Sequence, residues 1–384
     1  MRVGIPKEIL PLERRVAANP ETVAKIVKSG MQVAVESGAG RGSFLEDRDF
    51  EAAGATIEPT AQSLFSQSDI VLKVNRPTLG EVNLIKEGAV LISLLQPLAD
   101  PPAVRRLAER RVSALAMELV PRITRAQRMD SLSTMSTVAG YKAVLMAANA
   151  SGRFLPMLST AAGTIPPAKA IVIGAGVAGL QAIATAKRLG AVVTAFDTRP
   201  AVGEQVKSLG AEFVALDVPH DQAEDAGGYA RELSPDFYKK EQELIRRYSK
   251  DADLIITTAL VPGKRAPTLI TEEMVREMKP GSVIVDLAVE QGGNCALSEP
   301  GKEVVKFGVT LIGTFNLAST VPVHATQLYA KNILAFLNLI SPDGKSLKLD
   351  PSDEIIRGAL VTHQGEIVHV ATAEALKKAS AAPA

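Results

Sequence analysis

Short apolar runs recur along the chain, and segments with helical periodicity separate them. In the first third, strands are predicted at residues 2–5, 32–36, 69–74, 88–94 and 112–116, and helices at residues 20–29, 47–53 and 101–110. Several of these strands are continuously apolar rather than alternating, which is typical of strands that are buried on both faces. Strands that alternate with helices in this way indicate an α/β domain with a mostly parallel sheet.

The pattern is interrupted in the middle of the chain and then starts again. Residues 121–136 are polar without a clear period, a long helical pattern covers residues 139–154, and residues 161–167 are predicted to be a turn that opens a new domain. Further strands are predicted at residues 170–173, 192–196, 212–216, 254–257, 283–287 and 310–312, and helices at residues 179–189 and 324–339. The last of these helices is expected to return the chain to the first domain.

We therefore predict two Rossmann-like α/β domains with mostly parallel sheets, joined by the two long helices and with a cleft between them. The first domain is assigned residues 1–136 and 325–384, and the second residues 137–324. A chain of 384 residues is too long for one ordinary hydrophobic core, which agrees with two domains. In such folds, ligands bind at the carboxyl ends of the strands.

Composition narrows the possible functions. Hydrophobic residues make up 46% and charged residues 22%, an ordinary globular balance. A net charge of +1 with scattered basic residues argues against nucleic acid, because phosphate binding needs a concentrated basic face. The N-terminus does not resemble a signal peptide, and no apolar run approaches the roughly 20 residues that cross a bilayer. The single cysteine, Cys295, fits a reducing cytosol and is expected to be a small buried residue rather than a reactive thiol. No metal site is predicted.

A glycine-rich turn follows the strand at residues 170–173 and opens the next helix. It consists of Gly174, Ala175, Gly176, Val177, Ala178 and Gly179. In a G-x-G-x-x-G turn the first glycine permits the tight turn, the second lets the backbone approach a pyrophosphate, and the third lets helix and strand pack closely. The helix N-terminus adds N–H groups and a positive dipole end for the diphosphate. The pattern predicts a dinucleotide site, with a purely structural turn as the alternative.

An acidic residue, Asp197, ends the next strand, 18 residues after Gly179 and near the expected spacing of about 20. A carboxylate at this point accepts hydrogen bonds from ribose hydroxyls and repels a 2′-phosphate, which favours NAD(H) over NADP(H). Thr198 and Arg199 follow it and are included in the predicted cofactor site. Arg199 could in principle receive a phosphate instead.

Two later strand ends fit the rim of the same site. Thr258, Ala259 and Leu260 follow the strand at residues 254–257, where small side chains allow a nucleotide to lie over the sheet. Asp286, Leu287 and Ala288 end another strand, and Asn294 follows after a flexible glycine pair. Either segment alone could be ordinary loop chemistry, but together they describe one rim.

The distribution of histidines bears on the type of reaction. The sequence has four, at His220, His324, His363 and His369. None is at a strand end expected to face the nicotinamide. A dehydrogenase acting on an alcohol or an amine also moves a proton and usually needs a base in the cleft. Hydride transfer between two nicotinamides needs only rings that are held close, aligned and shielded from water. The absence of such a base is therefore expected for hydride transfer between two nicotinamides.

Several segments resemble the alanine dehydrogenases and the alpha subunits of proton-translocating NAD(P) transhydrogenases, which share a fold. They are residues 2–8, 14–17, 279–286 and 291–294. Alanine dehydrogenases carry a catalytic histidine where this chain has Leu95, and an aspartate where it has Glu290. Residues 122–133 are similar to the nicotinamide-side loop of the transhydrogenases. The chain therefore resembles most strongly the soluble NAD(H)-binding component of that family.

The resemblance implies roles for particular residues. Arg122, Gln127, Asp130 and Ser133 match the loop residues that lie near the nicotinamide, and we expect them to be the catalytic group. Without the resemblance, this loop would be interpreted as a solvated connector. Tyr229, which follows two glycines, matches a mobile-loop tyrosine that closes over bound nucleotide. From the residues alone, an incidental tyrosine on a surface loop is the simpler interpretation.

The resemblance also implies the reaction and the partners. NADH bound to this chain would pass hydride directly to NADP+ on an NADP(H)-binding beta subunit, and a membrane-spanning subunit would couple this to proton movement. The chain would be a homodimer in the cytoplasm, docked on the inner face of the membrane through those partners. Two alternatives stay open. One is an alanine-dehydrogenase-like amino-acid oxidoreductase, because Arg15 and Lys73 match the substrate-binding positions of that family. The other is a non-catalytic NAD sensor, which would lack redox turnover.

Overall fold

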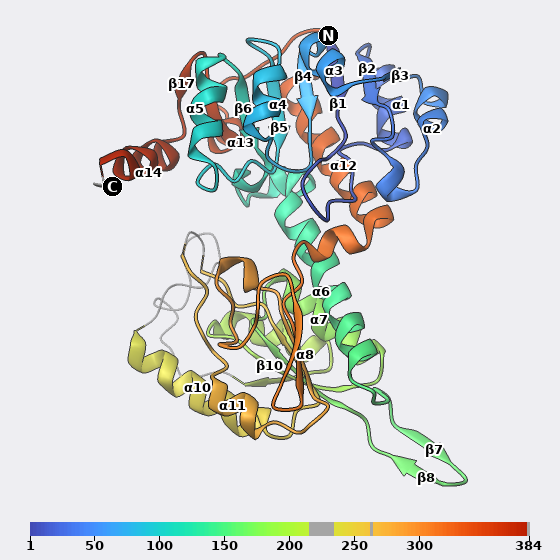
Figure 1. Cartoon of the computed structure of the whole chain (residues 1–384), viewed down its shortest axis with the longest axis vertical. Helices are drawn as coiled ribbons and strands as arrows, with labels where there is room; N and C mark the ends of the chain where they lie inside the picture. The colour runs from blue at the N-terminus through green and yellow to red at the C-terminus, as the bar shows by residue number, and fades with distance from the viewer. Residues whose placement is uncertain (215–233, 262–263, 382–384) are drawn as a thin grey trace. The chain divides into compact units, whose positions relative to one another are not determined.

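The chain divides into two compact units. The computed structural model describes residues 1–214, 234–261 and 264–381. Unit 1 comprises Met1–Met135 and Ser319–Ala384, and unit 2 comprises Ser136–Ala318. Each unit contains a large, mostly parallel sheet with helices packed against it (Figure 1). The predicted two-domain α/β fold with mostly parallel sheets is thus confirmed. Tyr229 lies outside the described residues.

Among the described residues, unit 1 is built on an eight-stranded sheet in the order β17-β16-β6-β5-β4-β1-β2-β3. Its strands are β1 (Arg2–Ile5), β2 (Gln32–Glu36), β3 (Thr56–Glu58), β4 (Ile70–Leu72), β5 (Val90–Ser93), β6 (Ser113–Ala116), β16 (Leu360–His363) and β17 (Glu366–Ile367). Its helices include α1 (Pro20–Lys28), α2 (Asp47–Ala52), α3 (Ala61–Gln67), α4 (Leu79–Leu84), α5 (Pro101–Glu109), α12 (Pro322–Ile340), α13 (Glu354–Ala359) and α14 (Val370–Ala381). Strands β1 to β6 pair in parallel, whereas β16 and β17 add an antiparallel edge that the sequence pattern did not predict.

The described strands of unit 2 form a seven-stranded sheet in the order β11-β10-β9-β12-β13-β15-β14. They are β9 (Lys169–Ile173), β10 (Val192–Phe196), β11 (Glu212–Val214), β12 (Leu254–Thr257), β13 (Val283–Asp286), β14 (Glu303–Lys306) and β15 (Val309–Ile312). Helices α7 (Val177–Arg188), α8 (Gly203–Ser208), α10 (Pro235–Ser249) and α11 (Glu272–Glu277) accompany them. A separate hairpin, β7 (Leu158–Thr160) and β8 (Gly163–Ile165), projects from the body of this unit (Figure 1).

The sheet of unit 2 is buried on both faces, which explains its continuously apolar strands. On one face Val172 belongs to a buried cluster with Ala195 and Ile256. On the other face its neighbour Ile171 belongs to a second cluster with Ile255. Because successive side chains of a strand point to opposite faces, both sets of positions must be apolar.

The strand order places the ends of β9 and β12 side by side. From β9 the chain first winds outward through β10 and β11, then returns to the other side of β9 with β12 and β13. Ile173 pairs in register with Phe196 on one side and with Thr257 on the other. This reversal is a topological switch point, where open α/β sheets bind ligands beyond the carboxyl ends of their strands.

Several boundaries differ from the prediction. The long helix α6 (Ser131–Ala150) begins eight residues before its expected start at residue 139 and runs from unit 1 into unit 2. Its first turn follows a capping residue, Asp130, whose Oδ1 accepts a hydrogen bond from the Ser133 N–H at 2.8 Å. A turn defined by polar capping has no apolar period to reveal it. Residues 161–167, predicted to be a turn, contribute to the β7–β8 hairpin, and α12 lies wholly within unit 1. None of the described helices has both the length and the apolar character that a bilayer crossing requires.

Candidate functional site

The glycine turn lies at the switch point, directly after β9. Gly174 has a φ of +94°, and a Cβ built on it would lie 2.6 Å from Thr258 Oγ1. A Cβ on Gly179 would lie only 1.8 Å from the Gly174 carbonyl oxygen. At Gly176, by contrast, the nearest neighbouring atom is the tip of the Arg199 side chain at 3.9 Å. The first and third glycines are therefore required by the fold, and the middle one leaves an open approach to the backbone.

Helix α7 starts inside this turn with an N-cap, Gly176, that has no side chain to satisfy the first-turn N–H groups. The first intrahelical bond runs from the Leu180 N–H to the Gly176 carbonyl at 2.8 Å. The N–H groups before it point along the helix axis and carry the positive end of the dipole. A diphosphate fits this arrangement without any positively charged side chain. The start of α7 is held in place by α6, since a Cβ on Gly140 would lie 2.1 Å from the Ala178 carbonyl oxygen.

The predicted ribose-binding acid, Asp197, is 8% exposed and follows β10. Its Oδ2 accepts a hydrogen bond from the Ala175 N–H at 2.6 Å. Arg199 donates to the same carboxylate from its backbone N–H, Nε and Nη2 at 2.9, 2.9 and 2.7 Å. The guanidinium that could have received a 2′-phosphate is therefore engaged by Asp197. Thr198 lies between them, half-buried.

Thr258 and Asn294 brace the rim of the site. The Thr258 hydroxyl donates to the Gly174 carbonyl at 3.0 Å, which ties the end of β12 to the glycine turn. The Asn294 amide accepts from the Ala259 N–H at 3.0 Å, and donates to the carbonyls of Ala259 at 2.9 Å and Pro267 at 2.8 Å. Asn294 is fully buried, so in this structure its side chain holds the loop in shape. Leu260 is exposed at the rim.

The sequence pattern placed one further residue, Asp286, at a strand end on the rim but gave it no structural role. Asp286 ends β13, is fully buried, and accepts hydrogen bonds from the N–H groups of Ala288, Asn294 and Cys295 and from the Thr257 hydroxyl. It thereby fixes the turn that carries Asn294. Burial raises the pKa of the Cys295 thiol to about 11, so this cysteine is a small buried residue, as expected, rather than a nucleophile.

The four residues predicted to lie near the nicotinamide are in unit 1, around the short helix η3 (Thr124–Met129) and the start of α6. The Ser133 hydroxyl donates to Asp130 Oδ2 at 2.6 Å and accepts from Arg122 Nη2 at 3.3 Å. Arg122 Nε lies 3.8 Å from the same Asp130 oxygen. The structure thus brings Arg122, Asp130 and Ser133 into one cluster, while Gln127 is exposed on η3. The glycine turn and Asp197 belong to unit 2.

Helix η3 is anchored from two sides. Asn332 of α12 donates to the Arg128 carbonyl at 2.8 Å. The Arg125 guanidinium makes a bidentate pair with Asp353 at 2.8 and 2.9 Å. Met129, the last residue of η3, is buried. These contacts hold the segment that carries Gln127 on a rigid support, as an orienting residue requires.

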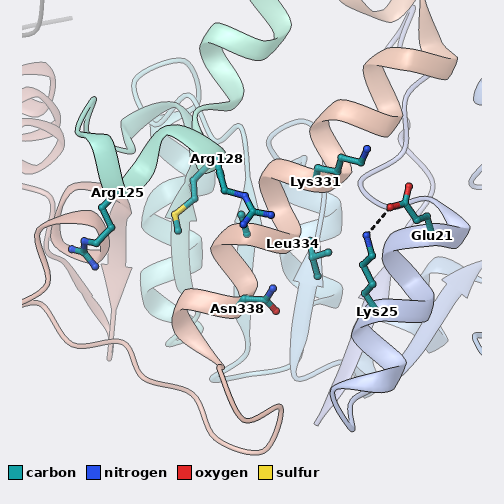
Figure 2. A pocket seen from close by; sticks show the side chains of 9 residues that line it. Glu21, Lys25, Arg125, Arg128, Lys331, Leu334 and Asn338 are labelled. Atoms are coloured by element: carbon teal, nitrogen blue, oxygen red, sulfur yellow. Dashed lines mark hydrogen bonds and ion pairs between the residues drawn. The ribbon is translucent and has the colours of Figure 1, made fainter.

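A pocket of about 580 Å³ lies in unit 1 beside η3 (Figure 2). It is lined by Glu21, Lys25, Arg125, Arg128, Met129, Lys331, Leu334, Ala335 and Asn338. Arg128 extends from η3 toward α12, from which Lys331 projects (Figure 2). Four cationic side chains and one carboxylate give the pocket a positive character. Arg125, Arg128 and Met129 of the loop at residues 122–133 line it, but none of the four residues expected near the nicotinamide does.

Two cations that we expected to match alanine dehydrogenase substrate positions, Lys73 and Arg15, are buried in unit 1. Lys73 is 1% exposed, and its Nζ lies 2.6 Å from Glu81 Oε1 and 3.4 Å from Glu8 Oε2. Arg15 is 4% exposed and donates to Glu13 from Nε at 2.7 Å and from Nη2 at 2.6 Å. Both charges are balanced by carboxylates inside the fold. Leu95, at the position of the alanine dehydrogenase histidine, is buried and apolar.

Comparison with known families matches nearly the whole chain. Residues 4–139 match the family "Alanine dehydrogenase/PNT, N-terminal domain", and residues 143–370 match "Alanine dehydrogenase/PNT, C-terminal domain". The chain is 54% identical over 378 residues to an NAD(P) transhydrogenase alpha-subunit chain of Rhodospirillum rubrum, covering 97% of this chain and 98% of that one. It is 30% identical over 383 residues to an alanine dehydrogenase of Methanococcus maripaludis, covering 98% and 96% of the two chains.

Solved structures give the same pair of relatives. A transhydrogenase from Sinorhizobium meliloti superposes with a TM-score of 0.85 at 44% identity, covering 97% of this chain and 100% of that one. An L-alanine dehydrogenase superposes with a TM-score of 0.83 at 28% identity, covering 98% and 99%. Similarity in fold therefore does not separate the two activities, which leaves the decision to the residues of the site.

Two glycine substitutions separate fold from ligand binding. Gly179→Ala is expected to lower the free energy of unfolding by about 1–3 kcal/mol, because its Cβ would collide with a backbone carbonyl that cannot swing away. Gly176→Ala, at φ −74° and in open space, is expected to change stability by less than about 0.5 kcal/mol. It should still weaken NADH binding at least about tenfold by keeping the pyrophosphate off the backbone. Denaturant unfolding and NADH titration of both variants check this, and normal NADH affinity in a stable Gly176→Ala protein would contradict it.

Proposed function

Because the chain belongs to the alanine dehydrogenase/PNT family, we propose that it is the NAD(H)-binding component of a proton-translocating NAD(P) transhydrogenase. The observation that carries this proposal is the presence of two sets of residues in one chain. Unit 2 has the glycine turn with Asp197, and unit 1 has the Arg122–Asp130–Ser133 cluster beside Gln127. The transhydrogenase alpha subunits among its relatives support the same assignment.

In this proposal NADH is a substrate. One hydride leaves C4 of its dihydronicotinamide and bonds to C4 of the nicotinamide of NADP+ on a partner beta subunit. The products are NAD+ and NADPH, and no proton is taken up or released in the step. The chain therefore needs no general base, which agrees with Leu95 at the position where alanine dehydrogenases have a histidine. Its task is to hold and align the ring.

The cluster in unit 1 is suited to that task. Ser133 and Arg122 are held in place by Asp130, so the carboxamide oxygen of a nicotinamide would meet an arginine donor that is already oriented. Gln127, on the anchored helix η3, presents both a donor and an acceptor, which match the two ends of a carboxamide. Asp197 and the start of α7 would hold the ribose and the diphosphate.

An alanine-dehydrogenase-like reaction is the second candidate, because Arg15 and Lys73 are retained. It would need a base for the amino group, and it would oxidise NADH with pyruvate and ammonia in the absence of a partner. Both cations are paired with Glu13, Glu81 and Glu8, and a substrate carboxylate would have to compete with those partners. The transhydrogenase assignment does not require Arg15 or Lys73 to give up these partners.

We also propose that the chain works within a complex of several subunits. A membrane-spanning subunit would carry the protons, and the chain would sit on the cytoplasmic face of the membrane through its partners, as a homodimer. The β7–β8 hairpin supports the dimer, because Met157, immediately before β7, and Ile165, at the end of β8, are 63% and 44% exposed. A two-stranded hairpin is marginally stable in isolation and gains from packing against another surface. We propose that a second copy of the chain packs against this hairpin.

The double variant Met157→Ser/Ile165→Ser tests the dimer. Light scattering after gel filtration is expected to show a dimer for the unmodified chain and a shift toward monomer for the variant. Val305→Thr removes a similarly exposed apolar side chain from the edge strand β14 and should leave the dimer intact. An unmodified chain that is monomeric at micromolar concentration would contradict the proposed homodimer.

Hydride transfer tests the function itself. The purified chain, mixed with NADH, NADP+ and an NADP(H)-binding transhydrogenase domain, is expected to form NADPH. Gln127→Asn should slow this transfer at least about tenfold while changing NADH affinity by less than about twofold, because the shorter side chain still binds but misplaces the ring. Gln32→Asn, on the exposed side of β2, is the control and should have no effect. NADH oxidation that instead requires pyruvate and ammonia, with no NADPH formed, would favour the alternative.

A further inference from the structure

A buried acid close to Asp197 has no assigned role. Glu241, on α10, is 7% exposed, and within the described residues its carboxyl group makes no hydrogen bond or ion pair. Its oxygens are not among the fully enclosed side-chain atoms that lack a partner, so they keep some contact with solvent. Burial of most of the side chain still disfavours the charged form. Such a group is retained most readily where a ligand supplies the missing partner.

The position of α10 directs Glu241 to the ribose end of the site. Ile245 and Tyr248, one and two turns further along the same helix face, pack against Phe196 at the end of β10. The rings of Tyr248 and Phe196 meet edge to face, with 5.2 Å between their centres. Because α10 leads into the parallel strand β12, its N-terminal half lies toward the carboxyl ends of the strands. Glu241 therefore faces the segment that begins with Asp197, and the two carboxyl groups interact electrostatically.

Asp197 has little free capacity for a ribose. A carboxylate offers about four acceptor positions. Four are used by the Ala175 N–H and by the backbone N–H, Nε and Nη2 of Arg199. An incoming ribose diol must displace or share some of these bonds. Glu241 is the neighbouring carboxyl group whose hydrogen-bonding positions are vacant among the described residues.

We propose that Glu241 is the second carboxyl group of the adenosine-ribose subsite and helps to select NAD(H) over NADP(H). This inference rests on the proposed NAD(H) site at the glycine turn. A 2′-phosphate would face two acids, and the nearby guanidinium of Arg199 is already paired with one of them. Glu241 is in this sense a specificity-determining residue. The glycine turn and the single acid that follows it do not reveal it.

The protonation state of Glu241 makes the proposal testable, because it predicts that NADH binding depends on pH. Burial, with a further contribution from the Asp197 charge, raises the pKa of Glu241 to about 7. Asp197 is the charged group that acts on Glu241, and Arg199 is paired with that aspartate. Tyr238 precedes Glu241 by three residues on α10. The neutral acid can donate a hydrogen bond to a ribose oxygen, whereas the ionised form cannot. A bound nucleotide buries Glu241 further and favours the neutral form, so NADH binding takes up a proton and weakens as the pH rises through about 7.

The test is the pH dependence of nucleotide binding to the full chain. NADH and NADPH are titrated by calorimetry between about pH 6.5 and 8.5 with the unmodified chain, Glu241→Gln and Glu243→Gln. The Kd for NADH of the unmodified chain is expected to rise about tenfold over this range. Glu241→Gln should keep one Kd throughout, because the amide donates at every pH, and should bind NADPH more tightly than the unmodified chain does. Glu243, on the exposed face of α10, is the matched control and should behave as the unmodified chain.

The outcomes separate this inference from the proposed function. Equal, pH-independent NADH affinities for the unmodified chain and Glu241→Gln would overturn the role of Glu241 while leaving the NAD(H) site in place. Absence of NADH binding to the unmodified chain at every pH would instead defeat the proposed function. A ¹³C NMR titration of the glutamate carboxyl groups in the unmodified chain needs no variant to fold. A resonance that titrates near pH 7 and shifts with NADH supports the inference, and no such resonance contradicts it.

Discussion

The nucleotide site depends on one close backbone contact, between the end of β9 and the start of α7. Gly179 approaches the Gly174 carbonyl so nearly that no side chain fits between them, and the Thr258 hydroxyl holds the same carbonyl from β12. This contact places the N-terminus of α7 at the switch point of the sheet and brings Ala175 against Asp197. Diphosphate binding and ribose recognition, as proposed, both follow from it.

Much of this arrangement could be predicted from the sequence, because its causes are local. Continuous apolar runs located β1, β2, β10 and β12 at the bounds that the structure shows, and the glycine pattern located the turn. The features that could not be predicted depend on contacts between segments that are distant in the sequence. The strand order that makes β9 and β12 neighbours has no local signal, nor do the hydrogen bonds by which Asp286 shapes the Asn294 turn. Glu241 was missed because α10 has a highly charged sequence, in which one buried acid cannot be distinguished from its solvated neighbours.

Fold alone does not decide the reaction. The chain shares its two-unit architecture with alanine dehydrogenases as well as transhydrogenases. We expect the difference to lie in a few positions, among them the apolar Leu95 and the polar loop that ends in the Asp130–Ser133 cap. In the proposed function, the dinucleotide turn, the apolar Leu95 and the preorganised polar loop would align a ring for a hydride acceptor that another chain brings.

The central claim is that hydride passes directly from NADH on this chain to NADP+ on a partner. Transfer of deuterium measures this most directly. NADH carrying deuterium at both C4 positions is mixed with the chain, NADP+ and an NADP(H)-binding transhydrogenase domain in ordinary water, and the NADPH is analysed by mass spectrometry. Direct transfer predicts NADPH that carries one deuterium in every molecule formed. Unlabelled NADPH, with the deuterium lost to solvent, would contradict it.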